Sequence, residues 1–191
     1  MKLLCFGDSN TYGYDPRSFF GERHGRDIRW TALLDRETKW DVVNAGRNGR
    51  EVPHTQGQLQ QAAEELRCYG QADLLAVMLG GNDLLQNGSY TAPDVRARME
   101  TFLQFLIAEG YTPSSLLLIA PSAMQRGTWV TEERLLKESR ALGTEYKTLA
   151  HRLGVRFADS SAWDIEVLFD GVHYSEKGHR SFADGMKTLL G

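Results

Sequence analysis

Four residues of the chain have the types that acyl-transfer chemistry requires: Ser9, Asn82, Asp170 and His173. A serine hydroxyl is a weak nucleophile near neutral pH and needs an adjacent base to take its proton. His173 can accept that proton and return it to the leaving group. Asp170 lies three residues before His173, close enough in sequence to orient the imidazole ring and stabilise its charged form. These residues predict a nucleophilic serine with a histidine base and an aspartate partner.

Donors for the oxyanion of a tetrahedral intermediate are also present. Each amide aimed at such an oxyanion contributes about 3–4 kcal/mol to catalysis. The candidate donors are the backbone N–H of Ser9, the backbone N–H of Gly49 and the side-chain amide of Asn82.

Apolar segments that end in glycine-containing turns precede these residues. Continuous apolar runs bounded by turn signals are typical of strands that are covered on both faces. The carboxyl ends of parallel strands lie at one edge of a sheet, and ligands bind at that edge. Three turns, together with the loop that carries Asp170 and His173, therefore predict a single site there. The simpler alternative for Ser9 is a cap of the segment that follows it. The turns are Gly7-Asp8-Ser9-Asn10, Gly46-Arg47-Asn48-Gly49 and Gly80-Gly81-Asn82-Asp83.

Strands and helices are expected to alternate along the chain. Thr131 and Ser175 are the expected N-terminal residues of the last two helices. Alternation of this kind implies parallel strands with right-handed crossovers, and therefore an α/β fold with a three-layer α/β/α sandwich. We expect one domain, residues 1–191. The expected strands cover residues 3–6, 40–45, 73–79, 115–120 and 155–158, and the expected helices cover residues 29–38, 55–68, 92–109, 131–153 and 176–190.

The composition is that of a globular protein: 41% of the 191 residues are hydrophobic, 25% are charged, and the formal net charge is −3. Without a basic excess, neither nucleic acid nor an anionic membrane is favoured as a partner. The first apolar run is too short for a signal peptide, and no run is long enough to span a bilayer. We therefore expect a cytoplasmic protein. Cys5 lies in the first expected strand and predicts a buried free thiol.

The turns resemble the four sequence blocks of the SGNH, or GDSL-like, hydrolase superfamily. The resemblance implies Ser9 as the nucleophile, Asp170 and His173 as the rest of the triad, and Gly49 and Asn82 as oxyanion donors. It favours Gly49 over the competing Gly46 by its place in the block. It also implies a flavodoxin-like sheet with strand order 2-1-3-4-5 and neither a metal nor an organic cofactor. The matching blocks are Gly7-Asp8-Ser9-Asn10, Gly49, Gly80-Gly81-Asn82-Asp83 and Asp170-Gly171-Val172-His173.

A shorter stretch, Asp27-Ile28-Arg29-Trp30-Thr31, is similar to the arylesterase and acetylesterase branch. The chain departs from the family pattern at Asn10, where many members have leucine. We expect little consequence, because the side chain after the nucleophile makes no bond to substrate. The G-x-S-x-G elbow is absent from residues 7–11, which argues against the α/β-hydrolase fold.

Other polar and aromatic residues favour structural roles. Asp8 and Asp83 are expected to brace their turns by local hydrogen bonds and not to bind a metal. Phe19 and Phe20 are expected to pack over the sheet. Four histidines without a partner pattern are expected on the surface or in packing: His24, His54, His151 and His179. Four aromatic residues either line a pocket or form an interface: Tyr12, Tyr14, Trp129 and Trp163.

The combined pattern predicts a serine esterase that hydrolyses short-acyl, acetyl-type esters through an acyl-enzyme intermediate. Little apolar sequence is left in the loops to bind a long acyl chain. The alternatives are a lysophospholipase or thioesterase of the same family, a flavodoxin-like module that binds a phosphate or FMN, and a non-catalytic binding module. Asp170 and His173 argue against the last two. The expected partner is a small-molecule ester, and the sequence leaves the natural ester and a homo-oligomer open.

Overall fold

A five-stranded parallel sheet forms the centre of the computed structural model, which describes residues 1–191. The strand order is β2-β1-β3-β4-β5, and every neighbouring pair is parallel. This arrangement confirms the predicted α/β fold and the predicted strand order. The strands are β1 (Lys2–Gly7), β2 (Asp41–Gly46), β3 (Leu74–Met78), β4 (Leu116–Ala120) and β5 (Arg156–Asp159).

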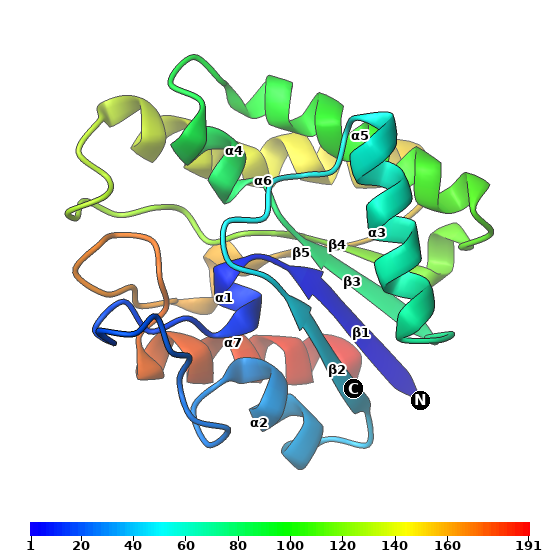
Figure 1. Cartoon of the computed structure of the whole chain (residues 1–191), viewed down its shortest axis with the longest axis horizontal. Coiled ribbons are helices and arrows are strands. Elements are labelled where there is room, and N and C mark those ends of the chain that lie inside the picture. The colour runs from blue at the N-terminus through cyan, green and yellow to red at the C-terminus, as the bar shows by residue number, and fades with distance from the viewer.

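Helices cover both faces of the sheet (Figure 1). On one face lie α2 (Trp30–Glu37) and α7 (Glu176–Leu190), and on the other lie α3 (Gln56–Cys68), α5 (Ala92–Ala108) and α6 (Glu133–Leu153). None of the helices is both long enough and apolar enough to cross a membrane. The shorter elements are α1 (Ser9–Tyr12), α4 (Gly81–Gln86) and the 3-10 helices η1 (Pro113–Ser115) and η2 (Ser160–Trp163).

Two buried clusters explain why β1 is apolar at successive positions. Leu4 and Phe6 pack into the cluster beneath α3, α5 and α6, whereas Leu3 and Cys5 pack into the cluster beneath α2 and α7. Successive side chains of a strand point to opposite faces, so a strand covered on both sides needs apolar residues at every position. Cys5 is a buried free thiol, as predicted, and burial raises its pKa.

The helix caps agree with the sequence in part. Ser175 caps α7, because its hydroxyl accepts a hydrogen bond from the Gly178 N–H. Thr131 does not begin α6, because the N-cap is Glu132 and its side chain makes no capping bond. The cap of α1 is Asp8, so Ser9 is the first helical residue and not a cap. The simpler interpretation of Ser9 is therefore wrong.

Phe19 and Phe20 do not pack over the sheet, which corrects the prediction. The two residues are 93% and 83% exposed, and their rings contact each other edge to face, with 5.2 Å between centroids. An antiparallel bridge between Tyr14 and Arg23 closes the loop that carries them. The two residues lie between the bridged positions of that loop and are exposed to solvent.

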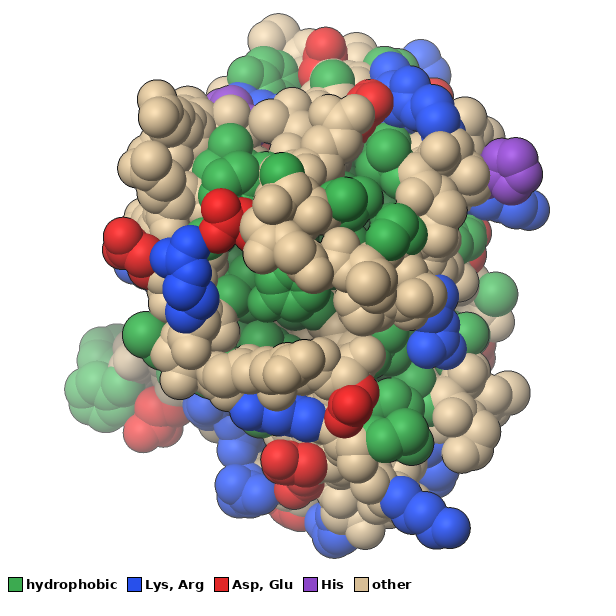
Figure 2. Space-filling model, turned by 90° about the vertical axis from the view of Figure 1, so that its right-hand side faces the viewer, with side chains coloured by type: hydrophobic (Ala, Val, Ile, Leu, Met, Phe, Trp, Pro, Cys, Tyr) green, Lys and Arg blue, Asp and Glu red, His purple; other side chains and the backbone are tan.

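The carboxyl ends of the strands all point toward one edge of the molecule (Figure 1). In this view β1 runs into α1, and the loops of residues 121–132 and 164–175 lie on the same side. Figure 2 shows the face at the amino ends of the strands, where Lys and Arg side chains are spread among Asp and Glu side chains. The predicted site residues lie at the edge opposite that face.

Candidate active site

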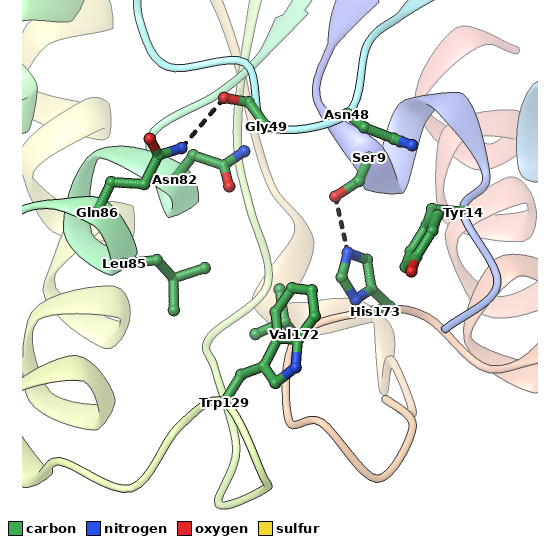
Figure 3. Close-up of a pocket in the computed structure, with 10 residues that line it drawn as sticks. All are labelled: Ser9, Tyr14, Asn48, Gly49, Asn82, Leu85, Gln86, Trp129, Val172 and His173. Carbon is green, nitrogen blue, oxygen red and sulfur yellow. Dashed lines mark hydrogen bonds between the residues drawn. The ribbon is translucent and has the colours of Figure 1, made fainter. Parts of the chain in front are cut away.

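Ser9, His173 and Asp170 form a continuous chain of hydrogen bonds at the carboxyl edge of the sheet. The distance from Ser9 Oγ to His173 Nε2 is 2.9 Å, and that from His173 Nδ1 to Asp170 Oδ2 is 2.6 Å. The exposed fractions of the three residues are 7%, 2% and 0%. Figure 3 shows the bond between Ser9 and His173 at the side of a cavity. One ring nitrogen thus faces a hydroxyl, and the other faces a carboxylate.

The turn between β1 and α1 positions Ser9. The Asp8 carboxylate accepts a hydrogen bond of 2.9 Å from the Asn10 N–H, as predicted for a local turn contact. The Ser9 carbonyl accepts bonds from Gly13 N and Tyr14 N. Ser9 is the first residue of α1, and the first N–H groups of a helix have no intrahelical partner. The Ser9 N–H is therefore suited to an external acceptor.

A tight turn places Asp170 opposite the ring of His173. Gly171 has φ +83°, and a Cβ atom there would lie 2.1 Å from the Gln125 carbonyl oxygen, so the turn requires glycine. Asp170 Oδ1 accepts hydrogen bonds from Val172 N (2.9 Å) and His173 N (3.0 Å). Burial opposes ionisation of Asp170, but its hydrogen bonds from His173 and Val172 together lower its pKa below the ordinary value. The carboxylate is therefore charged near neutral pH.

Gly49 and Asn82 line the same cavity as Ser9 and His173. Asn82 Nδ2 donates to the Arg50 carbonyl at 3.1 Å, and Gln86 Nε2 donates to the Gly49 carbonyl at 3.2 Å. These bonds fasten α4 to the loop after β2, and Figure 3 shows the second of them. The N–H of Gly46 instead donates to Asn44 Oδ1 at 2.9 Å, so it is not available to a substrate.

The segment after Gly80 forms a helix, which the sequence analysis missed. Gly80 has φ +120°, and a Cβ atom there would lie 2.5 Å from the Tyr146 hydroxyl. Only glycine fits this turn, so β3 can stop there and α4 can begin at Gly81. Leu85 and Gln86 consequently lie on a helix that lines the cavity, and not in a loop.

Asp83 does not brace its own turn, which corrects another prediction. Its carboxylate accepts hydrogen bonds from Val52 N at 3.0 Å and from Arg98 at 2.8 Å. Burial raises the pKa of Asp83, and the bonds from Val52 and Arg98 lower it in part. Asp83 links α4 both to α5 and to the loop that contains Gly49.

Two of the four aromatic residues that the sequence assigned either to a pocket or to an interface contact His173. Tyr14 and Trp129 lie edge to face with the imidazole at centroid distances of 4.8 and 5.1 Å. Tyr12 instead lies under the Arg23 guanidinium, and Trp163 packs on Phe182. The cavity has a volume of about 580 Å³ and is lined by Ser9, Tyr14, Asn48, Gly49, Asn82, Leu85, Gln86, Trp129, Val172 and His173.

The remaining histidines lie outside this cavity. His24 and His179 are buried and contact each other edge to face at 5.1 Å, as expected for packing residues. Burial lowers the pKa of His179 to about 3, so this ring is neutral. His54 is half-buried and His151 is exposed. No group of three or more potential metal-ligating side chains occurs in the structure.

The comparison with protein families identifies the chain. Residues 5–181 match the GDSL-like lipase/acylhydrolase family. The chain belongs to this family. It is a carboxylic ester hydrolase that acts on small-molecule esters, and the family predicted from the four blocks is confirmed. The phosphate-binding alternative also conflicts with the Asp8 carboxylate, which lies at the start of α1 and accepts a hydrogen bond from the Asn10 N–H there.

Several solved structures are similar to this chain over nearly its full length. A protein from Agrobacterium tumefaciens, provisionally called an arylesterase, is 26% identical, with a TM-score of 0.86 and coverage of 99% of this chain and 97% of that chain. A carbohydrate acetylesterase family member from Sinorhizobium meliloti is 23% identical, with a TM-score of 0.85 and coverage of 99% and 96%. The aryl esterase of M. smegmatis is 22% identical, with a TM-score of 0.84 and coverage of 99% and 97%. The last two share the fold. No curated protein matches the sequence significantly.

Proposed function

We propose that the chain is a serine esterase that hydrolyses short-acyl, acetyl-type esters through an acyl-enzyme intermediate. One observation carries the proposal: hydrogen bonds run without a break from Ser9 through His173 to Asp170. In this proposal Ser9, His173 and Asp170 are catalytic, and the oxyanion donors are the Ser9 N–H, the Gly49 N–H and the Asn82 amide.

In the first half-reaction, Ser9 Oγ attacks the ester carbonyl carbon while His173 Nε2 accepts the hydroxyl proton. The charged Asp170 stabilises the imidazolium through its 2.6 Å bond to Nδ1. The bond between the carbonyl carbon and the alcohol oxygen then breaks. His173 gives its proton to that oxygen, the alcohol leaves, and the acyl group stays on Ser9.

The charge on the carbonyl oxygen falls on the side of the cavity that carries Gly49 and Asn82. One N–H of the Asn82 amide donates to the Arg50 carbonyl, which leaves the second N–H for the oxyanion. Because α4 and the Gly49 loop are bonded together, these donors are in position before the charge develops.

In the second half-reaction, water takes the place of the alcohol. His173 accepts a proton from this water, whose oxygen attacks the acyl carbon. The bond from that carbon to Ser9 Oγ breaks, His173 returns the proton to Ser9, and the carboxylic acid leaves.

The lining of the cavity supports a short acyl group. Its four hydrophobic members, Tyr14, Leu85, Trp129 and Val172, are interspersed with the polar side chains of Asn48, Asn82 and Gln86 and form no continuous apolar groove. Met124 is buried in the core and offers no groove wall. A long chain would gain about 0.8 kcal/mol per methylene only where apolar walls cover it. The names of the Agrobacterium and Sinorhizobium proteins, an arylesterase and an acetylesterase family member, also support this substrate class.

The catalytic assignment is tested by Ser9→Ala together with labelling by an active-serine phosphonate. The wild type should be labelled at Ser9, and the variant should lose nearly all esterase activity while its thermal unfolding stays unchanged. Ser139→Ala is the matched control, because Ser139 is also buried but lies outside the cavity. Retained activity in Ser9→Ala, with labelling at another residue, would exclude Ser9 as the nucleophile.

The acyl preference is tested separately with p-nitrophenyl esters from acetate to decanoate at fixed pH. We expect the highest kcat/KM for acetate or propionate and a fall as the chain lengthens. A maximum at octanoate or beyond would contradict the short-acyl substrate and favour a lysophospholipase, even if Ser9 proves to be the nucleophile.

A further inference from the structure

The side chain of Asn10 connects α1 to the loop that carries His173. Its Nδ2 donates to the Val172 carbonyl at 3.1 Å, and its Oδ1 accepts from the Tyr174 N–H at 3.1 Å. These two backbone groups belong to the residues on either side of His173. One amide therefore holds both flanks of the histidine, although we expected the side chain at position 10 to have little consequence.

Asn10 is itself firmly anchored. Its backbone N–H donates to Asp8 at 2.9 Å, and its carbonyl accepts from the Trp30 indole at 2.9 Å. Asn10 is 9% exposed and Trp30 is 1% exposed. The amide is thus a fixed group in the turn next to Ser9, and it cannot follow the histidine loop if that loop moves.

The other backbone bonds of His173 remain within its own loop. Its N–H donates to the Asp170 carboxylate at 3.0 Å, and its carbonyl accepts from Leu168 N at 2.7 Å. These bonds shape the loop but do not set its distance from α1. Apart from the bond between Ser9 and His173, the hydrogen bonds between α1 and residues 172–174 all come from Asn10.

We propose that Asn10 is a positioning residue that sets the distance and angle between the Ser9 hydroxyl and the His173 imidazole. The inference rests on the proposed function, in which these groups are nucleophile and base. A carbonyl needs a donor and an N–H needs an acceptor, and an amide side chain supplies both. Leucine has a similar size but neither group, and aspartate lacks the donor.

The first measurement compares kcat and KM of Asn10→Leu and the wild type with p-nitrophenyl acetate. A misplacement of about 1 Å costs about 10²-fold in rate, so we expect kcat to fall by about that factor while KM changes by less than about twofold. Asn44→Ala is the matched control. Asn44 Nδ2 bonds the Thr11 carbonyl of α1 at 2.6 Å, but Asn44 makes no bond to the histidine loop. We expect its kcat to stay within about threefold.

The second measurement asks whether Asn10 acts through His173. In a His173→Ala background, adding Asn10→Leu should leave the residual activity unchanged, because there is no imidazole left to position. An equal further loss in that background would overturn the proposal and make Asn10 a merely structural residue. Thermal unfolding of each variant reports whether it is folded. If Asn10→Leu does not fold, Asn10→Asp takes its place, because it has the same shape and keeps the acceptor for Tyr174.

The Ser9 and Asn10 variants together distinguish a failure of the proposed esterase mechanism from a failure of the positioning role of Asn10. Activity retained in Ser9→Ala would overturn the proposed function. An inactive Ser9→Ala together with wild-type kcat in Asn10→Leu, or in Asn10→Asp if the leucine variant does not fold, would overturn only the positioning role.

Discussion

Asp170, in the loop before His173, and Asp8, in the turn before Ser9, are both buried, with exposed fractions of 0% and 5%. Asp170 accepts three hydrogen bonds, from the His173 ring and from two backbone N–H groups. Asp8 accepts one, from Asn10 N. The pKa of Asp170 is lowered, whereas burial raises the pKa of Asp8 to about 6.

The two carboxylates differ in their hydrogen-bond partners, and burial also acts more strongly on Asp8 than on Asp170. Burial always disfavours the charged form, and hydrogen bonds to that form oppose the effect. Three donors outweigh burial at Asp170, but at Asp8 the Asn10 N–H and more distant positive groups do not. The Asp170 loop stabilises a permanent negative charge beside the imidazole, while Asp8 caps a helix at a cost in stability.

The largest effect is expected from Asp170→Asn, which removes the stabilised charge. An amide cannot stabilise the imidazolium and favours the wrong histidine tautomer, so kcat for p-nitrophenyl acetate should fall by about 10⁴-fold. Asp8→Asn is the control, because it removes the other buried carboxylate and leaves an equally good cap. We expect Asp8→Asn to change kcat by less than about threefold at pH 8, since Asp8 makes no bond to Ser9 Oγ or to the His173 ring. Equal losses in both variants would show that the two carboxylates do not differ in function.

A smaller effect is expected from Asn82→Ala. The Asp170 carboxylate is charged at all times, whereas the oxyanion that Asn82 would stabilise carries its charge only during the reaction. Removal of one oxyanion donor should lower kcat by about 10²–10³-fold with little change in KM. Asn87→Ala is the matched control at the other end of α4, because the Asn87 side chain bonds Glu51 and the Asp83 carbonyl outside the cavity. A change in KM alone would make Asn82 a ground-state binder instead.

The smallest effect is expected from Asp8→Asn on stability, and it should depend on pH. The folded pKa of about 6 lies above the ordinary value of 3.8, so the folded chain binds the proton more tightly than the unfolded chain. Stability is therefore lost as the pH rises from about 4 to about 6, and the loss persists above pH 6. A pKa difference of about 2 corresponds to about 3 kcal/mol. In urea unfolding, Asp8→Asn should be more stable than the wild type by up to about 3 kcal/mol at pH 8 and by less than about 1 kcal/mol at pH 4. An equal gain at both pH values would contradict the raised pKa.

Local patterns in the sequence were enough to predict the strands and most of the helices, whereas the order of the sheet was predicted from the resemblance to the GDSL-like family. The first strand was expected at residues 3–6 and spans Lys2–Gly7, and the last helix was expected at 176–190 and spans Glu176–Leu190. Continuous apolar runs, helical spacing and glycine turns are signals carried by neighbouring residues. Because parallel strands end at one edge of the sheet, the same signals also predicted a single site there. Its expected residues are Ser9, Gly49, Asn82 and His173.

Only the tertiary structure decided which distant groups the polar side chains contact. Asp83 bonds Val52 and Arg98 instead of its own turn, and Glu138 is buried because it accepts from Ala92 N at the start of α5. Phe19 and Phe20 are exposed because the loop that carries them closes on itself. Asn10 and Val172 are 162 positions apart, and no periodicity connects them. A sequence pattern records the period and the local turn of each element, whereas the partner of a buried polar group depends on how those elements pack.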